Sequence, residues 1–198
     1  MEKITITEAL SKVKLVDKKI TKKIAGAKFV GKQKGEKVLD NFEPESAKED
    51  LQSIEDLISY RFKLKNAIHD SNQKTIVNIS GKKYTVSEAI EFKEVSSYKL
   101  DLLRKMKNQS EVYSNQIALE NEKVQERLDI QISNLFEKPS AVEVDSFSKS
   151  FLKSNEYSLV DPIDINKKIK EYEEEIDGFL NEVDFKLSTS NSVTFIEI

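Results

Sequence analysis

The chain has 198 residues, of which 38% are hydrophobic and 34% charged, with a formal net charge of -3 at pH 7. It contains no cysteine, which excludes disulfides, thiolate zinc sites and cysteine nucleophiles. The low apolar and high charged content is typical of long helices with a narrow apolar stripe and wide solvated faces.

The first part of the chain predicts two helices joined by a lysine-rich loop. Thr5 and Glu8 are spaced as a capping box, and apolar residues then recur at helical spacing, which indicates a helix over 5–25. Three glycines end this helix and open a flexible loop that runs to about Pro44. Because proline suits the first turn of a helix, a second helix is expected over 45–70.

A β-hairpin is expected over residues 75–86, where two β-prone stretches flank a Ser-Gly-Lys turn. A lone hairpin is only marginally stable in water, so it should pack on helices or gain a partner strand. The alternating residues 193–198 predict a strand at the end of the chain, and this strand is the candidate partner.

Two more helices are expected in the second half of the chain. The longest covers 86–136 and ends before Pro139; its coiled-coil seam is formed by Ile117, Val124, Leu128, Ile132 and Leu135. Residues 139–163 form a mixed connector with room for one short helix. The last helix, 164–187, has the most regular stripe: Ile165, Ile169, Tyr172, Ile176, Phe179, Val183 and Leu187.

The expected fold class is therefore mainly α, with long antiparallel helices in a helical bundle or coiled coil, a small β-hairpin and a C-terminal strand, all in one elongated domain over 1–198. A helix of about 50 residues spans about 75 Å, which is longer than a compact domain of this size covers. Part of its seam must therefore meet another chain, or the helix must fold back at a break near Asn108-Gln109-Ser110. We favour other copies of the chain, and hence a homo-oligomer.

Three stretches resemble, in their order, the septicolysin-like family of small bacterial and phage-borne helical proteins: Ile68–Thr75, Gly81–Ile90 and the tail from Tyr157 to Ile198. In that family an Asn-x-x-Thr hairpin interrupts a helix pair, a Thr-x-(Asp/Glu)-Ala helix start follows, and a late helix ends in a short strand. This chain departs from the pattern by a longer basic loop and by extra length around 115–155. The resemblance implies a helical homo-oligomer without known enzymatic activity.

Charge is distributed unevenly along the chain. Residues 12–37 contain ten lysines and only two carboxylates, whereas residues 161–198 contain ten carboxylates and four lysines. The preferred interpretation is a pair of solvated, complementary surfaces, and the alternative is an anion-binding site at the basic end. The basic loop lacks the Gly-Lys-(Ser/Thr) ending of a Walker loop, but glycine N–H groups and lysine charge can hold an anion. The candidate ligand-binding residues are Lys22, Lys23, Lys28, Lys32, Lys34 and Asn72.

Other chemistries have less support, and no catalytic residue, metal ligand or cofactor is expected. His69 is the only histidine, and Asp70 and Ser71 adjoin it in sequence only. Consecutive glutamates at 173–175 point in different directions from a helix. The pI of about 5.5 argues against nucleic-acid binding. No window approaches 18 uncharged apolar residues, so no transmembrane segment is expected.

Three functions remain open. The first is a non-catalytic homo-oligomeric binding protein that, if phage-borne, sequesters an anionic small molecule such as a nucleotide signal at pockets between subunits. The alternatives are a structural coiled-coil component of a virion and a pore-forming protein. The expected location is the cytoplasm, which is the host cytoplasm for a phage-encoded chain.

Overall fold

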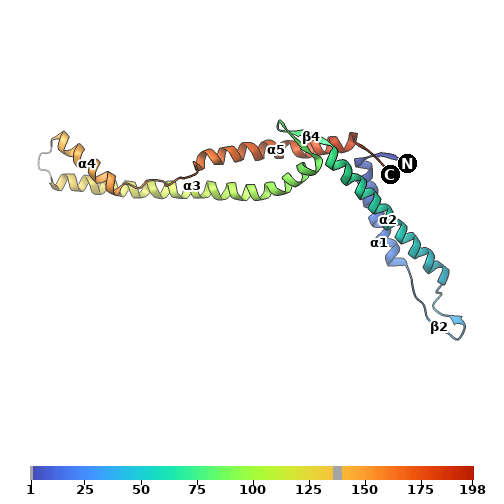
Figure 1. The fold of residues 1–198 in the computed structure, drawn as a ribbon. Helices are drawn as coiled ribbons and strands as arrows, with labels where there is room; N and C mark the ends of the chain where they lie inside the picture. Colours follow the sequence, from blue (N-terminus) through green and yellow to red (C-terminus); the bar gives the residue numbers. More distant parts are fainter. Residues whose placement is uncertain (1, 136–139) are drawn as a thin grey trace. The chain divides into compact units, whose positions relative to one another are not determined.

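The computed structural model describes residues 2–135 and 140–198, which form five helices and three two-stranded antiparallel sheets (Figure 1). The expected mainly-α fold with long antiparallel helices is confirmed. The expected helix end at 136 and the stop at Pro139 lie outside the described residues. The elements in chain order are β1 (Lys3–Thr5), α1 (Ile6–Gly26), β2 (Gln33–Lys34), β3 (Lys37–Val38), α2 (Pro44–Lys74), β4 (Ile76–Ile79), β5 (Lys82–Thr85), α3 (Val86–Leu135), α4 (Ala141–Asn155), α5 (Ile165–Val193) and β6 (Phe195–Glu197).

The chain divides into two compact units. The first contains Met1–Glu94 together with Gly178–Ile198, and the second is Val95–Asp177. Both boundaries fall inside helices, one in α3 and one in α5. The single elongated domain expected from the sequence stays a prediction. None of the described helices is both long and apolar enough to cross a lipid bilayer.

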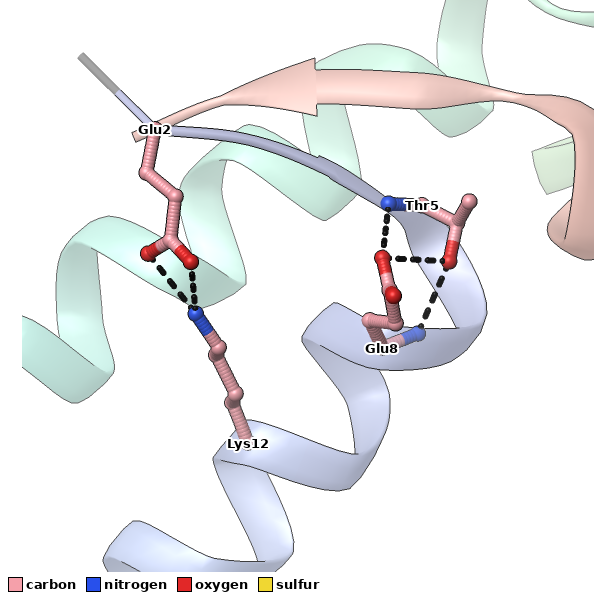
Figure 2. A network of polar contacts seen from close by, with 4 residues as sticks. All are labelled: Glu2, Thr5, Glu8 and Lys12. Atoms are coloured by element: carbon pink, nitrogen blue, oxygen red, sulfur yellow. Dashed lines mark hydrogen bonds and ion pairs between the residues drawn. The ribbon is translucent and has the colours of Figure 1, made fainter.

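Capping boxes begin three of the described helices, α1, α3 and α4. The Thr5 N–H donates to Glu8 Oε2 (2.8 Å), and the Glu8 N–H donates to Thr5 Oγ1 (3.2 Å), as Figure 2 shows. This exchange satisfies N–H groups that the first turn of α1 leaves without a helical partner. The same reciprocal pair recurs at the starts of α3 and α4, between Thr85 and Glu88 and between Ser140 and Glu143.

These hydrogen bonds make stability depend on pH. Bonds from Thr5 lower the pKa of Glu8, and bonds from Thr85 and Ser140 do the same for the pKa values of Glu88 and Glu143. Because each folded-state pKa lies below the unfolded value, the contribution is present above the unfolded pKa and is lost as pH falls through the folded one. We expect the urea midpoint of the native chain to fall between about pH 5 and pH 3. A variant with glutamine in place of Glu8, Glu88 and Glu143 should lose part of this pH dependence. If its urea midpoint changed with pH as much as that of the native chain, the three capping boxes would not be the cause.

The first core of unit 1 joins α1 and α2 to the sheet formed by the two ends of the chain. The contacts run in opposite directions along the two helices, because Arg61 pairs with Asp17 while Lys23 near the end of α1 lies 3.6 Å from Asp50 near the start of α2. The buried side chains of this core are Ile4, Ile6, Ala9, Val13, Val16, Leu64, Ile68 and Ile196.

The C-terminal strand β6 pairs with β1, so the expectation that it partners the hairpin is wrong. The register places Ile4 opposite Ile196, and both side chains are buried. The physical reason is the length of α5, which continues to Val193 rather than ending at 187 and delivers the chain end beside the start of α1. There the Ile6 N–H donates to the Thr194 carbonyl at 2.9 Å.

The hairpin β4–β5 packs on helices instead of gaining a third strand. Its turn uses Ser80 (φ 49°) and Gly81 (φ 77°), consistent with the positive φ angles that two-residue hairpin loops require. Beneath it lies the second core of unit 1, in which the rings of Tyr84, Phe92 and Phe179 meet at tilted or edge-on angles. The buried members of this core are Val77, Ile79, Val86, Ala89, Phe179 and Val183.

In unit 2 the chain folds back over its own longest helix. The Asn121 side chain exchanges two hydrogen bonds with the Tyr157 backbone, at 2.8 and 2.9 Å. Helix α4 starts soon after α3 ends and stops just before Tyr157, and both α4 and the stretch from Asn121 to Leu135 are about 21 Å long. Helix α4 must therefore run back along α3, where Figure 1 also shows it.

The long seam of α3 is thus covered largely within one chain. Four residues of α3 are already buried in a single chain, before any second copy binds: Leu103, Met106, Val124 and Leu128. The helix is continuous through Asn108-Gln109-Ser110, where the sequence allowed a break. Of the seam residues expected from the sequence, Val124 and Leu128 are therefore covered within one chain. Helix α4 lies in the expected connector, and α5 supplies further cover of α3, with Lys99 Nζ 2.8 Å from Glu175 Oε2.

Candidate functional site

The basic loop after α1 contains a short hairpin made of β2 and β3. Lys34 pairs with Lys37 across it, and Gly35 turns the chain with a φ of 65°. The candidate residues Lys22 and Lys23 lie on the last turns of α1, Lys28 follows the helix, and Lys32 and Lys34 lie in or beside β2. All five lysines therefore belong to one end of the α1–α2 pair.

Carboxylates already face two of these lysines. The Nζ of Lys23 lies 3.6 Å from Asp50, and the Nζ of Lys32 lies 3.1 Å from Asp40. Both pairs are well exposed, so each contributes little to stability. They nevertheless lower the positive charge that an anionic ligand would meet.

Asn72 does not join the lysines. It lies near the end of α2, about 33 Å along the helix from Asp50, which contacts Lys23. The antiparallel pairing of α1 and α2 places the start of α2, rather than its end, beside the lysines. The prediction that Asn72 lies with the lysines of the basic loop is therefore wrong.

A shallow hollow of about 180 Å³ lies where the loop meets the start of α2. Glu43 precedes this helix without a side-chain cap, so N–H groups of the first turn keep their partial positive charge. Lys28 adds a full positive charge, whereas Glu43 and Asp50 oppose an anion. The hollow is lined by Gly26, Lys28, Asn41, Phe42, Glu43, Ser46, Ala47 and Asp50.

Phe42 and Asn41 are members of this hollow that sequence reasoning missed. A Cβ added to Gly31 would lie 2.6 Å from the Cβ of Phe42, so the ring packs on the glycine backbone. Asn41 has a φ of 51°, a conformation that asparagine tolerates better than most residues. The available signal was the Asp-Asn pair before Phe42 and Pro44, which is typical of a turn.

His69 lies on α2 and shares a 2.8 Å hydrogen bond with Gln73, one turn further along the same helix. Such an i, i+4 contact belongs to an exposed helix face. Among the residues that the structure describes, no three histidine or acidic side chains gather as a metal site would require.

A second hollow, of about 200 Å³, lies in unit 2 between α3 and the segment before α5. Asp161 is its one acidic residue, and its carboxylate accepts from the Ile165 N–H at 2.8 Å, which caps α5. The remaining lining is mostly apolar, so the hollow suits an apolar side chain. It is formed by Gln109, Ser110, Tyr113, Leu159, Val160, Asp161, Pro162, Ile163 and Ile165.

A row of exposed side chains follows one face of α3 in unit 2, and we call it the α3 row. Its apolar members are exposed by 37% to 74%, and they lie on a different face from the buried Val124 and Leu128. The helix therefore has one covered seam and one exposed seam. The α3 row recurs at alternating intervals of three and four residues, as in a coiled coil: Val95, Tyr98, Leu102, Lys105, Gln109, Val112, Gln116, Leu119, Lys123, Glu126 and Ile130.

Sequence reasoning did not separate these two seams. The expected seam of Ile117, Val124, Leu128, Ile132 and Leu135 includes the buried Val124 and Leu128, but also Leu135, which is 62% exposed. The α3 row also contains lysine, glutamine and glutamate, so the hydrophobic pattern of the sequence does not reveal its spacing. The row becomes apparent only when the exposed fraction of each side chain is known.

No protein-family model, curated protein or solved structure matches this chain. The resemblance to the septicolysin-like family therefore stays a prediction.

Proposed function

We propose that the protein is a non-catalytic helical homo-oligomer, a structural coiled-coil component that assembles through the α3 row. The observation that carries the proposal is the heptad spacing of exposed apolar residues on a helix whose other seam is already covered. Monomeric proteins rarely leave an extended apolar surface in water, and such surfaces usually mark interaction sites.

The apolar members of the row are large enough to drive association. Tyr98 is 74% exposed, and Leu119 and Ile130 are each 59% exposed. Full burial of a side chain of this size is worth roughly 1.5–3 kcal/mol. Several such residues on each copy therefore offset the loss of translational and rotational freedom on pairing, which is about 4–15 kcal/mol.

The mass in solution tests this function. We expect light scattering at micromolar concentration to give a multiple of the 22.7 kDa chain mass. Circular dichroism on the same sample controls for intact helices. A 22.7 kDa particle with full helicity at that concentration would overturn the proposal.

A second candidate function is binding of an anionic small molecule such as a nucleotide, at the hollow beside α2. It is favoured by the first turn of α2, which has no side-chain cap, and by Lys28 at its edge. We expect phosphate-bearing compounds to raise the thermal midpoint of the native chain and not that of Lys28→Glu. Lys63→Glu on α2 is the matched control. No shift with any such compound sets this candidate aside.

A pore-forming role, a phage origin and a cytoplasmic location stay predictions. No feature of the described residues favours pore formation over assembly.

A further inference from the structure

We propose that two copies of the chain pair antiparallel through the α3 row, with Leu102 of each copy opposite Leu119 of the other. This inference rests on the proposed self-assembly and adds its orientation and register. In this register the two-fold axis passes between Ser110 and Glu111. An arrangement with a two-fold axis closes on itself and produces a dimer, not a filament.

The dimensions of the row indicate what covers it. From Val95 to Ile130 it extends about 53 Å along the helix, so a partner needs a straight helix of similar length and period. Among the described helices only α3, with 50 residues, is that long. The exposed apolar residues of α2 run only from Leu51 to Phe62, about 17 Å. A second copy of α3 is therefore long enough to cover the row.

The charges in the row select the antiparallel orientation. A parallel, in-register pair would set Lys105 against Lys105, Lys123 against Lys123 and Glu126 against Glu126. Like charges placed opposite each other in a contact oppose association. Three such contacts would lie among eleven positions on each helix, which disfavours the parallel dimer.

The antiparallel register removes every one of these contacts. Lys105 then faces Gln116, and Glu126 faces Val95 of the other copy. Lys123 faces Tyr98, whose ring face attracts a cation. The two leucines meet at symmetric positions on either side of the axis, which provides an apolar contact at two points.

Near the axis the apolar hollow of unit 2 adjoins the row. Gln109 belongs to both, and Tyr113 lies beside it on the same helix. In the antiparallel pair Gln109 faces Val112 of the other copy. The hollow therefore lies next to the middle of the contact.

Cysteine crosslinking tests the register directly, because the chain has no cysteine of its own. Leu102→Cys and Leu119→Cys are prepared separately in the full chain and then mixed under mild oxidation. We expect crosslinked dimers in the mixture and little crosslinking of either variant alone. Crosslinking of Leu102→Cys to itself would show a parallel pair and overturn the inference. An absence of crosslinks in the mixture would overturn it as well.

A second measurement separates this inference from the proposed function. Tyr98→Ser, Leu102→Ser and Leu119→Ser combined should raise the dimer dissociation constant at least about 100-fold without loss of helicity. The matched control is Ile58→Ser with Phe62→Ser on α2, which should leave the mass unchanged. If the native chain is oligomeric and the α3 variant remains so, the α3 contact is wrong and self-assembly stands. If the native chain is a monomer, the proposed function itself fails.

Discussion

Replacing Phe179 with alanine is expected to lower the free energy of unfolding by about 3–5 kcal/mol. Phe179 lies on α5 and is only 2% exposed. Its ring centroid is 4.5 Å from that of Phe92 and 5.6 Å from that of Tyr84, both edge-on. Truncation removes two aromatic contacts and leaves a cavity under the hairpin, because the helices on either side can collapse only in part.

Urea denaturation followed by far-UV circular dichroism measures this loss. Phe185→Ala is the matched control, since it makes the same truncation on the same helix at a side chain that is 70% exposed. It should change the free energy of unfolding by no more than about 0.5 kcal/mol. Near-UV circular dichroism should show a weaker tyrosine signal only for Phe179→Ala. Equal losses in the two variants would mean that the hairpin core does not form as described.

The sequence predicts those parts of the fold that depend on neighbours along the chain. The stripe of the last helix selects Ile176, Phe179 and Val183, and all three are buried. The capping box of Thr5 and Glu8 is confirmed, because its spacing alone specifies the hydrogen bonds. Helical period and capping are local properties, so one sequence is enough to detect them.

Strand pairing depends on residues far apart in the chain, and here the sequence is insufficient. The alternation in 193–198 predicts a strand but does not identify the strand that it pairs with. The true partner, β1, has three residues and directly precedes a strong helix start, so no alternation marks it. Helix α5 continues to Val193, so the strand that follows it lies beside β1.

The ligand site predicted from the sequence lacks some of its residues because these residues, too, are brought together only by folding. The lysines are visible in the sequence, but Asp50 and Asp40, which pair with Lys23 and Lys32, become their neighbours only when the chain folds. The placement of Asn72 required the direction of α2 relative to α1. Composition predicts the charge of a segment, whereas the net field at a site depends on tertiary contacts.

Replacing Leu128 with alanine is expected to lower the free energy of unfolding by about 2–5 kcal/mol, by the same amount in dilute and in concentrated protein. Leu128 is 2% exposed and lies two turns after Asn121, whose side chain bonds to the Tyr157 backbone of the same chain. The residues that bury Leu128 belong to the same chain. The difference in free energy of unfolding between the native chain and the variant therefore does not depend on protein concentration. Urea midpoints at protein concentrations above and below the dimer dissociation constant provide the measurement.

Leu119→Ala makes the same truncation on the same helix, but at a position that is 59% exposed and belongs to the α3 row. In dilute protein it should leave stability within about 0.5 kcal/mol of the native chain. In concentrated protein it should lower the midpoint, because pairing then stabilises the native chain more than the variant. The two leucines therefore report on two different seams of one helix. If Leu128→Ala showed the concentration dependence expected of Leu119→Ala, the covered seam would be an interface between chains, and the assignment of the two faces of α3 would have to be exchanged.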